Sequence, residues 1–343
     1  MGGSGVHLCG SVPLPDAAGV FIQVATRLGV HITRIPDGET GDRGTGVPWQ
    51  LTRLRAHPDL VVVPPPGPEY GPGERVRPAP GIDPAAIDFG PLGYAESALR
   101  SWQVFERVRA DGAIRPGIRF QVSLPTPVAV TGALCAGPQA ALEQRWEAGI
   151  LDELARICAA VPHQDLAIQW DAAAEFALLE GASPSWFGDD RPAIFAGVVE
   201  RLVRLGEAVP EGVQTGYHLC YGDFGHPRAT EPADTSKLVA VASGIVHRLT
   251  RPLDWIHLPV PEDRADEEYY GPLAALALAP ETDLYLGLVH AADGFDGARR
   301  RIKAAQAFAP RFGIATECGM GRRPADQVPA LLDLHACLAN SLD

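Results

Sequence analysis

The feature that most constrains the fold is a repeated alternation of short apolar runs with longer amphipathic stretches. Most of the apolar runs are hydrophobic throughout, as expected for parallel strands that are covered on both faces. The eight runs predicted to be strands are Val6–Cys9, Val30–Arg34, Ile118–Val122, Leu166–Trp170, Val213–Tyr217, Asp254–Leu258, Leu284–Val289 and Gly313–Ala315.

Helical periodicity fills the stretches between these runs. In Ala140–Ala160, apolar residues such as Leu142, Trp146 and Leu154 recur at helical spacings. The other predicted helices are Ala193–Leu205, Thr235–His247, Tyr269–Leu278, Ala298–Phe308 and Ala325–Leu338. This alternation predicts an α/β fold, a single (β/α)8 TIM barrel that spans residues 1–343 as one domain.

Two alternatives accompany this fold prediction. An open, doubly wound sheet is less favoured, because no Gly-x-Gly-x-x-Gly motif follows the first strand. A proline- and glycine-rich stretch, Val63–Ala85, is predicted to be a long excursion over the barrel mouth, with a disordered surface loop as the other interpretation.

Composition narrows the class of protein. The chain is 46% hydrophobic and 21% charged, which is enough for a large core. Its net charge of −13, without a basic run, argues against a nucleic-acid partner. No apolar stretch approaches the ~20 residues of a membrane span, and the N-terminus lacks the features of a signal peptide. We therefore expect a cytoplasmic protein with no membrane partner; the oligomeric state is not indicated.

Polar residues follow most of the predicted strands. In a barrel, catalytic groups lie after the carboxyl ends of the strands, so a ring of such residues predicts an active-site mouth. A barrel that only binds a small ligand is the alternative. The polar positions are Gly10-Ser11, Asp37-Gly38-Glu39, Ser123, Asp171, His218-x-Cys220, Glu262, His290 and Glu317-Cys318.

Three of these residues predict a metal site. His218 and Cys220 are two residues apart, so an extended chain points both to the same side. Alone, the pair also fits a half-buried histidine beside a small apolar cysteine. Cys318, expected at the same end of the barrel, adds a second sulfur, and one nitrogen with two sulfurs favours a catalytic Zn²⁺ with one open position. The six scattered cysteines fit reduced thiols better than a disulfide scaffold.

The ordered set of motifs resembles the catalytic barrel of cobalamin-independent methionine synthase, in the uroporphyrinogen decarboxylase-like superfamily. The resemblance covers the catalytic half of that enzyme and nearly the whole of this chain. The matching segments are Gly10-Ser11-Val12-Pro13, Gly38-Glu39, Gln169-Trp170-Asp171, His218-Leu219-Cys220, His290 and Cys318-Gly319.

The resemblance implies a role for each matched residue. Zinc on His218, Cys220 and Cys318 would deprotonate a bound substrate thiol, which then attacks an alkyl donor. Gly10, Ser11, Glu39 and Asp171 would hold the substrate, with Glu39 and Asp171 also counted as catalytic, and His290 would donate a proton. Tyr217 is a further candidate substrate contact, although an aromatic residue at such a position more often packs in the core.

The chain also departs from the family. The family's glutamate zinc ligand corresponds to Pro259, which cannot bind metal. Either His257 or Glu262 is then a candidate fourth ligand, or the site has three protein ligands, as in thiol-alkylating relatives. The aromatic contact to folate has no clear counterpart, which leaves homocysteine and folate open. We expect transfer of a methyl or other alkyl group to a small-molecule thiol from a folate or another donor; the alternative is a zinc-dependent hydrolase or lyase on a small polar molecule.

Overall fold

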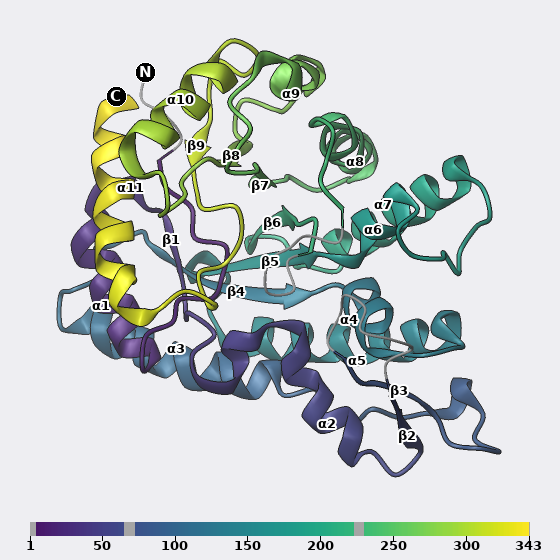
Figure 1. Ribbon diagram of the computed structural model, residues 1–343. Coiled ribbons are helices and arrows are strands. Elements are labelled where there is room, and N and C mark those ends of the chain that lie inside the picture. Colours follow the sequence, from purple (N-terminus) through teal and green to yellow (C-terminus); the bar gives the residue numbers. More distant parts are fainter. Residues whose placement is uncertain (1–4, 65–72, 223–229, 343) are drawn as a thin grey trace.

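The computed structural model describes residues 5–64, 73–222 and 230–342. Its centre is a curled, parallel, seven-stranded sheet in the order β1-β4-β5-β6-β7-β8-β9 (Figure 1). The strands are β1 (Arg34–Pro36), β4 (Arg119–Pro125), β5 (Leu166–Ala172), β6 (Gln214–Leu219), β7 (Trp255–Pro259), β8 (Asp283–Gly287) and β9 (Gly313–Ile314).

Helices cover the outer face of the sheet. The last helix packs against the first, which brings the two ends of the chain together (Figure 1). The longer helices are α1 (Ala17–Leu28), α3 (Tyr94–Ala110), α5 (Gln139–Ala160), α7 (Arg191–Glu207), α8 (Ser236–Arg248), α10 (Gly294–Gln306) and α11 (Val328–Leu342). The shorter helices are α2 (Gln50–Ala56), α4 (Pro127–Leu134), α6 (Ala174–Glu180) and α9 (Glu267–Tyr270).

The first predicted strand, Val6–Cys9, does not form a regular strand. Val6 instead makes isolated parallel bridges to Ile32 and to Ile314, so it lies between the chain that leads into β1 and strand β9. Positive φ angles at Gly5 and Gly10 bend the chain on either side and limit the ladder to this point. The predicted parallel α/β fold is confirmed, whereas the described residues contain seven regular parallel strands rather than eight.

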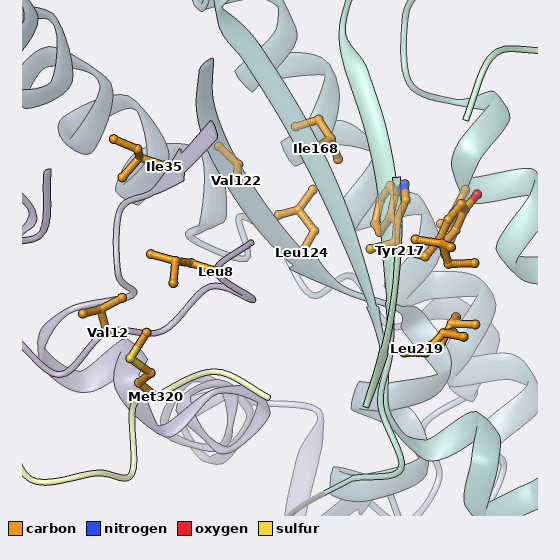
Figure 2. Close-up of a cluster of buried hydrophobic side chains, with 14 of the residues drawn as sticks. Leu8, Val12, Ile35, Val122, Leu124, Ile168, Tyr217, Leu219 and Met320 are labelled. Carbon is orange, nitrogen blue, oxygen red and sulfur yellow. The ribbon is translucent and has the colours of Figure 1, made fainter. Parts of the chain in front are cut away.

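Side chains alternate between the two faces of each strand. The outward side chains form the main hydrophobic core with the helices; Figure 2 shows Val122 and Leu124 of β4, Ile168 of β5, and Tyr217 and Leu219 of β6. The residues between them, such as Gln121, Gln169 and His218, lie on the inner face and are polar. The strands are therefore buried on both faces, but they are not apolar throughout as predicted.

Two predicted elements are wrong in extent. Val30–Arg34 is not a strand: a 3-10 turn occupies Gly29–His31 before β1 begins at Arg34. Tyr269–Leu278 is not a long helix: α9 ends at Tyr270, and a 3-10 turn covers Gly271–Ala275. Pro272 has no backbone N–H, so it cannot continue the hydrogen-bond pattern of α9.

The proline- and glycine-rich excursion begins in a hairpin. Strand β2 (Leu60–Val63) pairs antiparallel with β3 (Arg75–Pro78), and Val76 also bridges Cys135 at the end of α4. Residues 65–72 lie outside the described residues. The described part of 63–85 does not line the cavity at the carboxyl ends of the strands, and its predicted position over the mouth stays a prediction.

Candidate metal centre and active site

Strand β6 brings two of the predicted metal ligands to one place. His218 lies on the inner face near the end of β6, and Cys220 follows the strand, on the same side. The Cys220 N–H donates to the Ala172 carbonyl at 2.7 Å, which keeps the chain extended past the end of β6. Leu219, between them, points to the opposite face and packs in the core (Figure 2).

Cys318 reaches the same point from the loop after β9. Its sulfur lies 3.8 Å from the Cys220 sulfur, and one ligand atom from each of His218, Cys220 and Cys318 lies within 4.8 Å of the others. The Thr316 hydroxyl donates to the Cys318 carbonyl at 2.6 Å and shapes this loop. The structure therefore brings together three residues from distant parts of the sequence, with Cys220 and Cys318 separated by 98 positions.

The geometry of these three residues fits a tetrahedral zinc ion. Zinc–sulfur bonds of about 2.3 Å at tetrahedral angles place two sulfurs about 3.8 Å apart, the separation of Cys220 and Cys318. The buried Nε2 atom of His218 has no hydrogen-bond partner among the described residues. An unpartnered buried nitrogen is costly unless it binds a ligand, so the residues present fit the metal.

The pKa values of the Cys220 and Cys318 thiols are shifted in opposite directions. The hydrogen bond from Cys220 lowers the pKa of Cys318 well below its usual value, and the neighbouring His218 ring acts in the same direction. The same hydrogen bond raises the pKa of Cys220, and burial adds to this effect. A thiolate at Cys318 is the form that binds metal.

Two carboxyl groups lie beside the candidate metal ligands. Burial raises the pKa of Glu39 to about 7 and raises the pKa of Asp171 well above its usual value. Asp171 pairs in register with His218 across β5 and β6, and its Oδ1 accepts a hydrogen bond from the Gln169 amide at 2.8 Å. Both carboxyl groups therefore line the cavity beside the candidate metal ligands, and Glu39 can exchange a proton near neutral pH.

Glu39 is held in a strained turn after β1. It has a φ of 46°, and among the described residues it is the non-glycine residue with positive φ. The Glu39 N–H donates to Asp37 Oδ1 at 2.9 Å, and Asp37 Oδ2 accepts from Arg43 at 2.6 Å and from Ser101 at 2.8 Å. Such strain clusters at functional sites, so Asp37 fixes the turn that presents Glu39.

The Gly10-Ser11 segment joins the loops on either side of it. Met320 N–H donates to the Ser11 carbonyl at 2.7 Å, and Gly321 N–H donates to the Ser11 hydroxyl at 3.1 Å. A Cβ atom on Gly319 would lie 2.2 Å from the Ser11 hydroxyl, so this position needs glycine. The segment thereby holds the loop that carries Cys318.

A cavity of about 130 Å³ opens over the three candidate metal ligands. Its wall includes the carboxyl groups of Glu39 and Asp171 and the charged side chains of Arg43 and Arg322. The other lining residues are Cys9, Ser11, Gly44, Thr45, Gly46, Val47, Pro48, Trp49, Tyr94, Pro125, Ala173, His218, Cys220, Gly222, Cys318, Gly319 and Gly321. A concave pocket on which a few polar groups converge is typical of a small-molecule site.

Gly10 and His257 lie next to residues of the cavity wall without lining it, whereas three other predicted site residues lie away from it. Tyr217 points outward and donates to the Leu202 carbonyl of α7 at 2.8 Å, which corrects its predicted substrate contact. Glu262 is exposed and belongs to no metal-binding group among the described residues, so it is not a fourth ligand. His290 is buried, with Nε2 3.0 Å from the Val260 carbonyl and Nδ1 3.3 Å from Glu317, and it does not line the cavity.

The sequence reading missed Cys9, Trp49 and Tyr94 as cavity residues. Cys9 had a visible signal, because it directly precedes Gly10-Ser11 at the end of a predicted strand. Trp49 and Tyr94 had none, since they come from the loop after β1 and from the start of α3. Their rings meet edge to face with centroids 5.2 Å apart and form an aromatic part of the wall.

Two solved structures are similar to this one. A B12-independent methionine synthase from Shewanella sp. W3-18-1, in complex with selenomethionine, has a TM-score of 0.58 at 15% identity, over 98% of this chain and 96% of that chain. A protein from Listeria monocytogenes, provisionally assigned as a vitamin-B12-independent methionine synthase, has a TM-score of 0.55 at 14% identity, over 95% and 87%. This chain has their fold.

At these identities the likeness concerns the fold alone. The predicted resemblance to the methionine synthase catalytic barrel is confirmed at that level, and it extends over nearly the whole chain. No protein-family model matches the chain, and no curated protein matches it in sequence. No helix in the described part of the chain has the length and apolar character needed to cross a membrane.

Proposed function

We propose that this protein is a zinc-dependent enzyme that transfers a methyl or other alkyl group to a small thiol. The observation that carries the proposal is the meeting of one imidazole nitrogen and two cysteine sulfurs at the base of the cavity, with a sulfur–sulfur distance of 3.8 Å. Zinc bound there supplies a positive charge that lowers the pKa of a substrate thiol from its usual value of about 8.5.

The protein residues position the reactants. Glu39 and Asp171 accept hydrogen bonds from an ammonium or other polar tail of the thiol substrate, and the Gly10-Ser11 backbone completes that side of the site. The alkyl donor packs against Trp49 and Tyr94, because aromatic rings favour contact with planar groups. His290 reaches a leaving group only if its contact with Glu317 opens, so its predicted role as a proton donor remains part of the proposal.

Thiol binding tests this function. Addition of homocysteine, cysteine or another small thiol to the zinc-loaded protein in weak buffer is expected to release about one proton per site, and an alkyl donor then yields the thioether. Cys220→Ala is expected to abolish both. Cys135→Ala, a buried cysteine outside the cavity, is the matched control and keeps both. A metal-free Cys220→Ala protein with full activity would contradict the proposal.

A second function has one observation in its favour. The pKa of Glu39 is raised to about 7, which suits a general base that activates water at neutral pH. The reaction would then be a hydrolysis or an elimination on a small polar molecule. In that case no thiol adds a third sulfur to the metal's coordination shell, and the proton-release experiment distinguishes the two functions.

The proposal includes a closed (β/α)8 barrel that forms one domain. The bridges of Val6 to Ile32 and Ile314 support segment 6–9 as the eighth strand position between β1 and β9. Closure would place Gly10-Ser11 directly between the loops that carry Glu39 and Cys318.

A further inference from the structure

A second histidine lies directly behind the metal-facing histidine. His257 of β7 pairs in register with His218 of β6, so both side chains leave the sheet on the inner face. The two Nδ1 atoms are 2.7 Å apart, and the rings are tilted by 48° with centroids 4.7 Å apart. Both side chains are buried, so this contact is shielded from solvent.

The hydrogen-bond partner of His257 Nε2 determines which ring nitrogens of His257 and His218 carry a proton. Nε2 of His257 lies 3.1 Å from the Thr316 carbonyl oxygen. A carbonyl oxygen only accepts, so Nε2 carries the hydrogen. A second proton on His257 would create a buried cation against a neighbouring imidazole, which is costly. Nδ1 of His257 is therefore the acceptor, and Nδ1–H of His218 is the donor.

This arrangement leaves Nε2 of His218 for the metal. That atom has no hydrogen-bond partner among the described residues, and a ring nitrogen of His218 lies within 4.8 Å of the Cys220 and Cys318 sulfurs. We infer that His257 is a positioning residue that accepts the Nδ1–H of His218, and so presents Nε2 of His218 to the metal, without binding the metal itself. The inference rests on the metal site of the proposed function.

The set of protein ligands follows from this assignment. Cys9, His218 and His257 also have ligand atoms within 4.8 Å of one another, but both His257 nitrogens are already used in hydrogen bonds. His257 is thus corrected from candidate fourth ligand to support for His218. Three protein ligands remain, and the fourth position faces the cavity. The Thr316 carbonyl also couples His257 to the loop that carries Cys318.

Paired substitutions at His257 test the inference through zinc affinity. His257→Leu removes the acceptor, and the dissociation constant for zinc is expected to rise by about 10- to 100-fold. His257→Asn keeps an oxygen at the position of Nδ1 and is expected to recover most of this loss. His163→Leu, at the opposite end of the sheet, is the matched control and leaves zinc affinity unchanged. Circular dichroism and urea unfolding establish that each variant is folded.

Nitrogen-15 NMR of the imidazole groups gives a readout independent of folding and activity. We expect the Nδ1 of His218 to carry a proton in both the zinc-loaded and the metal-free protein, and its signal to shift in His257→Leu. Metal on Nδ1 of His218, or zinc affinity in His257→Leu equal to that of the wild type, would overturn the inference. If the wild type binds no zinc, the proposed function is wrong. The nitrogen-15 spectrum of the metal-free protein then still shows whether Nδ1 of His218 carries the proton.

Discussion

At the scale of single residues, Glu39 combines a strained backbone with a buried carboxyl group. The positive φ costs about 1 kcal/mol for any residue with a Cβ atom, but not for glycine. Glu39→Gly is therefore expected to be about 1 kcal/mol more stable than Glu39→Ala, while both lose substrate binding. Urea unfolding and thiol binding check this. Equal stability of the two variants would show that the turn is unstrained.

Glu175 offers a test of buried charge away from the cavity. Its Oε1 accepts from the Thr126 hydroxyl at 2.5 Å, and burial raises its pKa from about 4.5 to about 7. Between these values the native state holds a proton that the unfolded chain releases, so stability falls as pH rises. Glu175→Gln is expected to remove this slope, which amounts to about 3 kcal/mol between pH 4.5 and 8. Parallel urea-unfolding profiles of wild type and variant across this range would contradict the assignment.

The three candidate metal ligands could be picked out from the sequence because each lies at or after the end of a strand and carries a side chain that binds metals. Adjacent residues in a strand point to opposite faces, so an inward His218 requires an outward Tyr217. The sequence alone therefore argued against Tyr217 as a substrate contact. The role of His257 was not predictable. It depends on the lateral register of β6 with β7, which no local pattern in the sequence specifies.

At the scale of elements, the close approach of β6 and β7 depends on Gly216. A Cβ atom there would lie 2.1 Å from the ring of Trp255, the residue paired with it on β7. Gly216→Ala is expected to displace this ring and lower the free energy of unfolding by about 1–3 kcal/mol. Gly271→Ala, with no atom within 4 Å of the added carbon, is the control and should change stability little. A destabilisation equal in both variants would contradict this packing.

The regular strands β4 to β8 were predicted to within a few residues, because a continuous buried run is a strong local signal. The alternation of polar inner and apolar outer side chains went unrecognised. Gln169 and Asp171 flank Trp170 in a pattern of period two that was present in the sequence. The helix predicted at Tyr269–Leu278 failed because Pro272 outweighed its periodicity.

At the scale of the whole molecule, the candidate metal site brings together distant parts of the chain. His218 lies at the end of β6 and Cys220 follows it, whereas Cys318 follows β9, with β7 and β8 between these strands. A metal that binds the native state alone stabilises it by mass action. Removal of zinc with a chelator is therefore expected to lower the thermal midpoint of the wild type and to leave Cys318→Ser unchanged. If the chelator does not change the thermal midpoint of the wild type, metal binding at this site does not stabilise the fold, and the prediction is wrong.

The pairing of the first strand position with the last was beyond sequence reasoning. The bridges of Val6 to Ile32 and Ile314 involve a single residue between two glycine bends. The bridged residues are far apart in the sequence, so no local pattern indicates this pairing. Local sequence patterns therefore predicted the order of the helices and strands correctly. They did not show that Val6–Cys9 makes isolated bridges and no regular strand.

The most direct test of the central claim is the metal itself. Elemental analysis of the purified protein, combined with X-ray absorption at the zinc edge, is expected to give about one zinc per chain. Its coordination shell should contain two sulfurs at about 2.3 Å and one protein nitrogen at about 2.0 Å. Less than about a tenth of a metal equivalent, or a zinc shell without sulfur, would contradict the assignment of His218, Cys220 and Cys318 as the metal centre.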